Sequence, residues 1–243
     1  MHVETDERVK KLGTYVNSAH LKPEGAEMPA RVKAELPCLI YLNGRLSADT
    51  GCTPTDMDKL AVGRLGAMGL VRCQDITRVD VKILESTMPS REYKPLEGMP
   101  FAQVDVTSIR RRLVPKKPKD REREAERGID LTAINIERYH PSPEGLFACG
   151  VYRKGESTYY EDISILNAFF KAAGVALCQN PDLRDAMALV GGSITGEIAV
   201  HAQKCGFRAI CSPYAPTSAA LRAIRGKNLP IYGIFQGRAF KYC

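Results

Sequence analysis

Residues 186–197 read AMALVGGSITGE, and this stretch decides the fold class. Five apolar residues in a row are typical of a buried strand, and the glycines at 191 and 192 mark a turn. The helical spacing of Ile198, Ala202 and Cys205 predicts that a helix follows. A strand, a turn and a helix in this order are the unit from which parallel sheets are built. The stretch therefore predicts an α/β fold.

The same alternation extends along the C-terminal half of the chain. Further strands are predicted at 146–152, 209–211 and 229–235, and helices are predicted at 217–225 and after Asp162 or Ser164. Strands that alternate with helices pair in parallel, so we expect one layered sheet here.

The N-terminal half also mixes strands and a helix. Residues 36–42 are strand-like, and Asn43-Gly44 predicts a tight hairpin turn into a second strand. Thr53 is a plausible N-cap, with Pro54 at the first helical position, for a helix that runs to Gly69. A strand is predicted at 76–84, and residues 1–31 are expected to form a frayed arm or an edge strand.

Composition bounds the class of protein. The chain has 243 residues, 44% hydrophobic and 26% charged, which excludes a disordered or fibrous chain. No apolar run reaches the length of a membrane helix, and the polar N-terminus lacks the apolar core of a secretory signal, so we expect a cytoplasmic protein without a membrane span. The net charge of +7 indicates either an anionic partner or a basic, solvated surface.

The eight cysteines are scattered, and none form a C-x-x-C pair. In a chain without an export signal, this pattern predicts that most of the thiols are reduced and buried and that there is no disulfide framework.

A charged stretch divides the chain. We expect an N-terminal α/β subdomain at 1–108, a charged connection at 109–127 and a C-terminal domain at 128–243. The basic run 110–119 is interpreted either as a solvated linker or as an arm that binds RNA or protein.

Three segments carry possible chemistry. The loop with Gly192, Ser193 and Thr195 lies before a helix, where it would form either a phosphate site or a plain turn. His201 and Cys205 share a helical face, but no second pair has ligand spacing, which favours a structural role over a metal. Residues 233–241 combine two aromatic residues with two cations, as in a nucleotide site or an ordinary terminal strand.

Several motifs together resemble the FdhD/NarQ family of formate dehydrogenase accessory proteins. Cys52-Thr53-Pro54 with the later L-A-V-G at 60–63 resembles the C-T-P…L-A-V-G motif of that family, and residues 161–171 lie on its E-D-V-G-R-H-N-A-x-D-K motif. Residues 192–197 resemble S-G-R-x-S-x-E, residues 215–217 match A-P-T, and residues 233–240 resemble the terminal G-F-x-R-G-x-R-F motif.

The resemblance implies a C-terminal α/β/α domain similar to cytidine deaminases and a role in passing sulfur to the molybdenum bis-guanine-dinucleotide cofactor. That cofactor would be bound as a ligand, with no metal held directly by the chain. The implied partners are a formate-dehydrogenase-type oxidoreductase and a cysteine desulfurase, and a homodimer is allowed. The implied cofactor-binding residues are Ile234, Phe235, Gln236, Gly237, Arg238, Ala239, Gly192, Ser193, Thr195 and Asn167.

The sequence departs from the family pattern at its sulfur carrier. The family places a C-G-x-C-G loop where this chain has residues 109–127, which contain no cysteine. The family's charged or polar positions are also replaced, by Phe147, Ile165, Leu166, Phe170 and Ser193. We therefore expect an accessory protein without the usual relay. The alternative is sulfur transfer through a displaced thiol, with Cys149, Cys205 and Cys211 as candidates.

Overall fold

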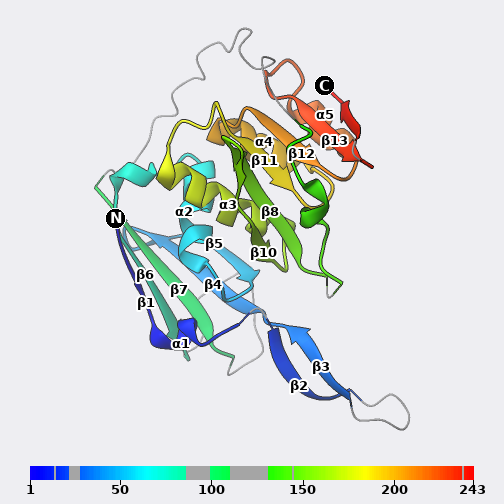
Figure 1. Ribbon diagram of the computed structural model, residues 1–243. Helices are drawn as coiled ribbons and strands as arrows, with labels where there is room; N and C mark the ends of the chain where they lie inside the picture. Colours follow the sequence, from blue (N-terminus) through cyan, green and yellow to red (C-terminus); the bar gives the residue numbers. More distant parts are fainter. Residues whose placement is uncertain (14, 22–27, 86–98, 110–130, 144, 237) are drawn as a thin grey trace.

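The computed structural model describes residues 1–13, 15–21, 28–85, 99–109, 131–143, 145–236 and 238–243 (Figure 1). It is a mixed α/β structure with two larger sheets and a small two-stranded one. The connection expected at 109–127 lies outside the described residues, apart from Ile109.

The N-terminal sheet has five strands in the order β1-β6-β7-β4-β5. Its strands are β1 (His2–Thr5), β4 (Leu36–Leu42), β5 (Arg45–Cys52), β6 (Ile76–Leu84) and β7 (Phe101–Ser108). The predicted hairpin joins β4 to β5, and both Asn43 (φ 50°) and Gly44 (φ 77°) take the left-handed conformation that such a turn requires. The Asn43 side chain also accepts a hydrogen bond from the Ser108 backbone at 2.8 Å, which ties the turn to β7.

The first 33 residues contain more secondary structure than the sequence predicted. β1 is an edge strand of this sheet, as expected, and the short helix α1 (Glu7–Lys10) follows it. Strands β2 (Tyr15–Leu21) and β3 (Met28–Lys33) then pair into a ribbon that projects from the body of the molecule (Figure 1).

The C-terminal sheet has seven strands, and its central part is parallel. The order is β10-β8-β11-β12-β13-β14, with β9 paired to β8. Its strands are β8 (Phe147–Arg153), β9 (Glu156–Ser157), β10 (Tyr160–Asp162), β11 (Met187–Val190), β12 (Ala209–Ser212), β13 (Ile231–Phe235) and β14 (Arg238–Lys241). Strands β11, β12 and β13 run parallel, as the alternation of strands and helices predicted.

The helices of this half cover one face of the sheet. Helices α3 (Ile165–Gln179), α4 (Gly196–Cys205) and α5 (Ser218–Ala223) contribute apolar residues to the same core cluster. On the opposite face, in the part of the chain that the structure describes, a second cluster is closed by the 3-10 helix η2 (Ile136–Tyr139). Among the described residues, η2 is thus the helical element that covers this second face of the sheet.

The two sheets share one hydrophobic core. Helix α2 (Met57–Ala67) from the N-terminal half packs against α3, and both lie between the sheets (Figure 1). The helices cross where two glycines face each other. A Cβ on Gly63 would lie 1.8 Å from the Phe170 carbonyl oxygen, and one on Gly174 would lie 2.2 Å from the Lys59 carbonyl oxygen. Only glycine permits this approach.

The predicted start of α2 is wrong. The helix begins at Met57, and its N-cap is Asp56, whose backbone is left-handed (φ 53°). Thr53 does not cap the helix because its hydroxyl lies in a buried polar network with Asp162 and Lys171.

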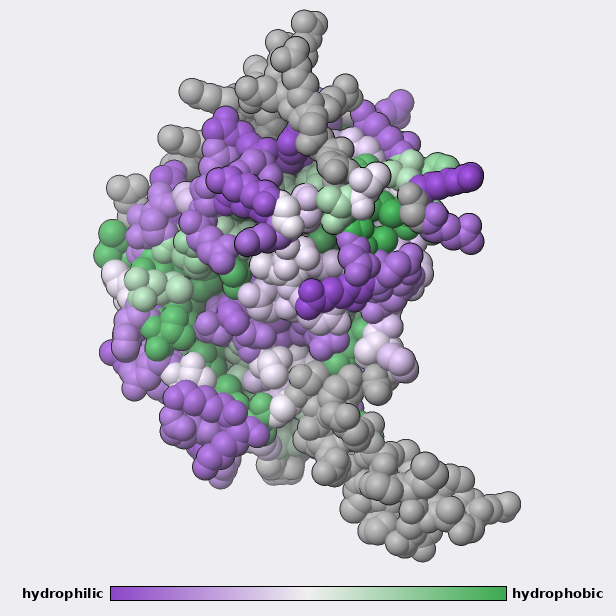
Figure 2. All heavy atoms as spheres, in the orientation of Figure 1, coloured by the Kyte–Doolittle hydropathy of each residue, from purple (hydrophilic) through white to green (hydrophobic). Residues whose placement is uncertain are grey.

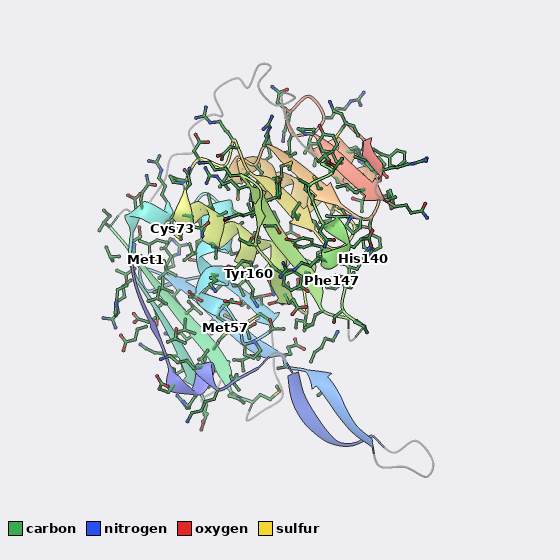
Figure 3. The ribbon with its side chains drawn as sticks, viewed as in Figure 1. Met1, Met57, Cys73, His140, Phe147 and Tyr160 are labelled. Atoms are coloured by element: carbon green, nitrogen blue, oxygen red, sulfur yellow. A yellow bond between two sulfur atoms is a disulfide. The ribbon has the colours of Figure 1, made fainter. Side chains whose placement is uncertain are left out.

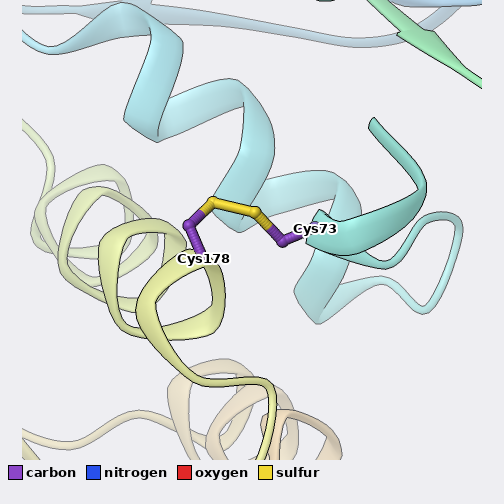
Figure 4. Close-up of a disulfide and its surroundings, with 2 residues drawn as sticks. All are labelled: Cys73 and Cys178. Carbon is purple, nitrogen blue, oxygen red and sulfur yellow. A yellow bond between two sulfur atoms is a disulfide. The ribbon is translucent and has the colours of Figure 1, made fainter. Parts of the chain in front are cut away.

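The prediction that most cysteines are reduced and buried agrees with the structure, but one pair forms a disulfide that the sequence did not predict. Cys73, in the 3-10 helix η1 (Cys73–Asp75), forms a disulfide with Cys178 near the end of α3 (Figure 4). The other six cysteines are free, and all of them except Cys243 are buried. Within the described ranges, no helix combines the length and apolar character needed to cross a bilayer.

Candidate functional site

The carboxyl ends of three parallel strands meet at one edge of the C-terminal sheet. β11 ends at Val190, β12 at Ser212 and β13 at Phe235, and each is followed by a loop or turn. The Ser212 hydroxyl donates to the Gly192 carbonyl at 2.7 Å and accepts from the Tyr214 backbone at 2.9 Å. This serine therefore fixes two neighbouring loops at the edge where parallel sheets usually present ligand-binding groups.

The glycine loop at this edge is held by packing. A Cβ on Gly191 would lie 1.8 Å from the Tyr139 carbonyl oxygen, and one on Gly192 would lie 2.6 Å from Ile165 Cδ1. Close packing is therefore sufficient to explain why both positions are glycine. Ser193 is exposed, and the hydroxyl of Thr195 accepts from the Ile198 backbone at 3.3 Å as the N-cap of α4.

Residues that replace charged positions of the family motifs gather beside this loop. Ile165 and Phe147 both lie within 4 Å of the position that a Gly192 Cβ would take. Phe170, a third such residue, is buried and packs edge-on against the His201 ring at 5.1 Å. The structure thus places the apolar side chains of Phe147 and Ile165 both beside Gly192.

Sequence reasoning missed a polar chain at the same edge. His140 Nδ1 lies 2.9 Å from the Tyr214 hydroxyl, and its Nε2 lies 2.9 Å from a Glu137 carboxylate oxygen. Figure 3 labels His140 beside η2, on the side of the C-terminal sheet that also carries Phe147. His140 and Tyr214 are 74 residues apart, and no sequence spacing links them.

The β13–β14 hairpin presents aromatic and cationic side chains. Phe235, Gln236, Arg238 and Ala239 are exposed, and the rings of Phe235 and Phe240 lie 6.3 Å apart. Ile234 is instead buried in the cluster beneath η2, and Gly237 lies outside the described residues. Figure 2 shows hydrophobic and hydrophilic residues adjoining at the upper right, where this hairpin lies in Figure 1. Strand β13, where the hairpin begins, is two strands away from β11, where the glycine loop begins. At the usual spacing of strands, this places the two about 10 Å apart.

Asn167 is not at this edge. Its side-chain amide donates to the Gly51 carbonyl at 2.8 Å and to Asp162 at 3.2 Å, in the interior between the two sheets. The predicted set therefore divides into residues at the carboxyl edge and one buried residue that joins the subdomains.

Asn167 belongs to a buried ionic network. Lys171 and Asp162 form an ion pair at 2.8 Å, and both side chains are fully buried. Lys171 also donates to the Thr53 hydroxyl at 2.7 Å and to the Glu161 carbonyl at 3.1 Å. Thr53 comes from one half of the chain and Asp162 and Lys171 from the other, so the network connects the subdomains.

The other predicted chemical groups have structural partners. His201 Nδ1 lies 3.2 Å from the Ala67 carbonyl oxygen, and burial lowers the pKa of its imidazole. Of the described residues, no three metal-ligating side chains come together in one place.

The candidate thiols are buried. Burial raises the pKa of Cys149, Cys205 and Cys211 to about 12 in each case. A sulfur carrier needs an accessible thiolate with a lowered pKa. These three thiols are instead buried, and the pKa of each is raised.

We expect these three thiols to resist alkylation in the folded chain. At pH 8, a thiol with a pKa of about 12 is ionised in roughly one molecule in ten thousand, and burial also blocks the reagent. Treatment with iodoacetamide without reductant, followed by peptide mass spectrometry, should modify Cys243 and leave Cys149, Cys205 and Cys211 intact. Labelling after unfolding in guanidinium should modify all six free cysteines. If any of the three is labelled rapidly in the folded protein, that cysteine would again be a candidate sulfur carrier.

Comparison with known proteins places these features in a family. Residues 33–242 match the model of the FdhD/NarQ family. The chain is 23% identical over 233 residues to the sulfur carrier protein FdhD of Geobacillus kaustophilus, with 86% of each chain covered. It is 26% identical over 232 residues to the FdhD protein of Listeria monocytogenes, with 87% and 88% covered. A solved structure from Desulfotalea psychrophila, assigned as a formate dehydrogenase accessory protein, matches with a TM-score of 0.63 at 21% identity and covers 95% of this chain and 96% of its own.

Proposed function

The chain belongs to the FdhD/NarQ family, and on this premise we propose that it binds a guanine-dinucleotide molybdenum cofactor at the carboxyl edge of β11, β12 and β13. It would serve a formate-dehydrogenase-type oxidoreductase as an accessory protein in the cytoplasm. The glycine loop and the β13–β14 hairpin, both at this edge, would hold the nucleotide part of the cofactor.

The observation that carries this proposal is that exposed aromatic rings and cationic side chains occur together on the hairpin. Phe235 and Phe240 are exposed and adjacent, which suits stacking on a guanine base. Arg238 lies on the same exposed strand as Phe240, which suits charge-assisted hydrogen bonds to phosphate. The exposed Ser193 supplies a further hydrogen-bonding group on the neighbouring loop. When bound, the cofactor would supply the molybdenum chemistry, and these residues would only hold and orient it.

Sulfur relay through the usual loop is not part of this proposal. Residues 109–127 contain no cysteine, and the alternative thiols Cys149, Cys205 and Cys211 are buried. The apolar side chains of Phe147 and Ile165 beside Gly192 add to this argument, because they stand where the motifs that the chain resembles carry polar groups. A desulfurase partner and a homodimer stay predictions. So does the RNA- or protein-binding role of 110–119, which lies outside the described residues.

We expect GDP to bind the full chain with a dissociation constant at or below the millimolar range. Isothermal titration calorimetry should detect the binding, and Arg238→Ala should weaken it about tenfold, because a charge-assisted hydrogen bond is lost.

The matched control is Arg78→Ala, since Arg78 is exposed on the distant β6 and contacts Glu4 and Asp80. This variant should bind GDP like the wild type. The absence of any heat with millimolar GDP, or equal losses in the two variants, would contradict the proposal.

A further inference from the structure

The disulfide lies at the interface between the N-terminal and C-terminal halves of the molecule. Cys73 follows α2, Cys178 lies near the end of α3, and their Cα atoms are 5.1 Å apart (Figure 4). The bridge closes a loop across 105 residues of sequence. Cys178 is exposed, whereas Cys73 is half-buried, so the two sulfur atoms differ in access.

A cavity opens beside one of these cysteines. It has a volume of about 240 Å³ and is lined by Cys178, by Val62 and Lys59 of α2 and by the N-terminal Met1. Cys73 is not among its lining residues. Figure 3 labels Met1 and Cys73 near one another on this side of the molecule. Cys178 is therefore both exposed and at the border of a cavity, whereas Cys73 is neither.

The other cysteines indicate the redox setting of the chain. Six of the eight are free thiols, and two of these, Cys38 and Cys52, stay free although their side chains are close enough to form a hydrogen bond. The pKa of the Cys52 thiol is raised well above its ordinary value by its hydrogen bond with Cys38 and by burial. A chain that keeps this many free thiols suits reducing surroundings, where disulfides are mostly transient or catalytic.

We propose that Cys73 and Cys178 form a thiol–disulfide exchange site that accepts low-molecular-weight thiols, with Cys178 as the sulfur that is attacked first. The thiolate of the incoming molecule forms a bond to Cys178 Sγ, the Cys73–Cys178 bond breaks, and Cys73 leaves as a thiolate that takes up a proton. A second thiol then attacks the mixed disulfide, which releases Cys178 as a thiolate. The net reaction oxidises two thiols to one disulfide and reduces the protein pair. This site is independent of the proposed cofactor edge.

The test uses the full chain with Cys243→Ser, which removes the exposed free thiol. Differential alkylation and mass spectrometry across glutathione redox buffers should show that the pair is reduced and reoxidised reversibly without denaturant. After brief exposure to reduced glutathione and an acid quench, peptide mapping should find the glutathionyl group on Cys178.

Two matched variants separate the roles of the cysteines. With oxidised glutathione, Cys73→Ser should acquire one glutathionyl group at Cys178, and Cys178→Ser should react at Cys73 about tenfold more slowly because that thiol is half-buried and outside the cavity. If either variant fails to fold, the mapping on the unsubstituted pair decides alone. A pair that stays oxidised in millimolar glutathione, or a glutathionyl group found on Cys73, would overturn the proposal.

Discussion

Replacing Lys171 with methionine should lower the free energy of unfolding by about 3 to 5 kcal/mol, because it leaves the Asp162 carboxylate buried without its cation. The ion pair spans 2.8 Å, and neither side chain is exposed. Methionine has a similar length and no charge, so packing changes little and the electrostatic loss dominates.

The hydrogen bonds that Asp162 retains would not compensate for this loss. Its carboxylate accepts from the Thr53 backbone at 3.2 Å and hydroxyl at 3.1 Å, from the Ser164 backbone at 3.0 Å and from Asn167 at 3.2 Å. These donors are neutral, and a buried carboxylate needs an opposite charge as well as hydrogen bonds. Thr53 would also lose the ammonium that bonds its hydroxyl, so the contact between the two halves would weaken.

Urea unfolding followed by circular dichroism at pH 7 measures this effect. Lys204→Met is the matched control, because Lys204 is an exposed lysine on α4, and it should change stability by less than about 0.5 kcal/mol. The double variant Asp162→Asn with Lys171→Met should recover part of the loss, since no unpaired charge is left. A Lys171→Met loss of under about 1 kcal/mol would mean that water or a rearrangement solvates Asp162.

Local signals in the sequence predicted the local parts of the fold. The Asn43-Gly44 hairpin, the strands at 146–152 and 229–235 and the helix after 196 all follow from turn chemistry and spacing within about a dozen residues. The carboxyl-edge position of the glycine loop follows from the same alternation, because parallel strands end at one edge.

The parts that the sequence did not predict depend on distant residues. Thr53 has the residue type and the position of a helix cap, but Asp162 and Lys171, more than 100 residues away, draw its hydroxyl into a buried network. Cys73 and Cys178 are likewise separated by 105 residues, and no spacing rule pairs them. The family motifs at Thr53 and at 161–171 were visible in the sequence. Their contact with each other was not.

Replacing Gly63 with alanine should destabilise the chain by about 3 kcal/mol, at the upper end of the cost of overpacking. The added methyl would lie 1.8 Å from the Phe170 carbonyl oxygen and 2.8 Å from the Gly174 nitrogen. Both of these atoms belong to the backbone of α3, so no side-chain rotation relieves the clash, and the helices must separate. The higher helix propensity of alanine offsets only up to about 1 kcal/mol.

Gly66→Ala provides the matched control in the same helix. There the added methyl would meet the end of the Leu177 side chain at 3.0 Å, which can rotate away, and the Val71 carbonyl only at 4.0 Å. We expect this variant to range from neutral to slightly more stable than the wild type, because alanine favours the helix. Thermal unfolding of both variants with the Cys73–Cys178 disulfide intact compares them directly. If Gly63→Ala and Gly66→Ala unfold at the same temperature, α2 and α3 do not touch through their backbones, and the subdomains are held by the ionic network and the disulfide instead.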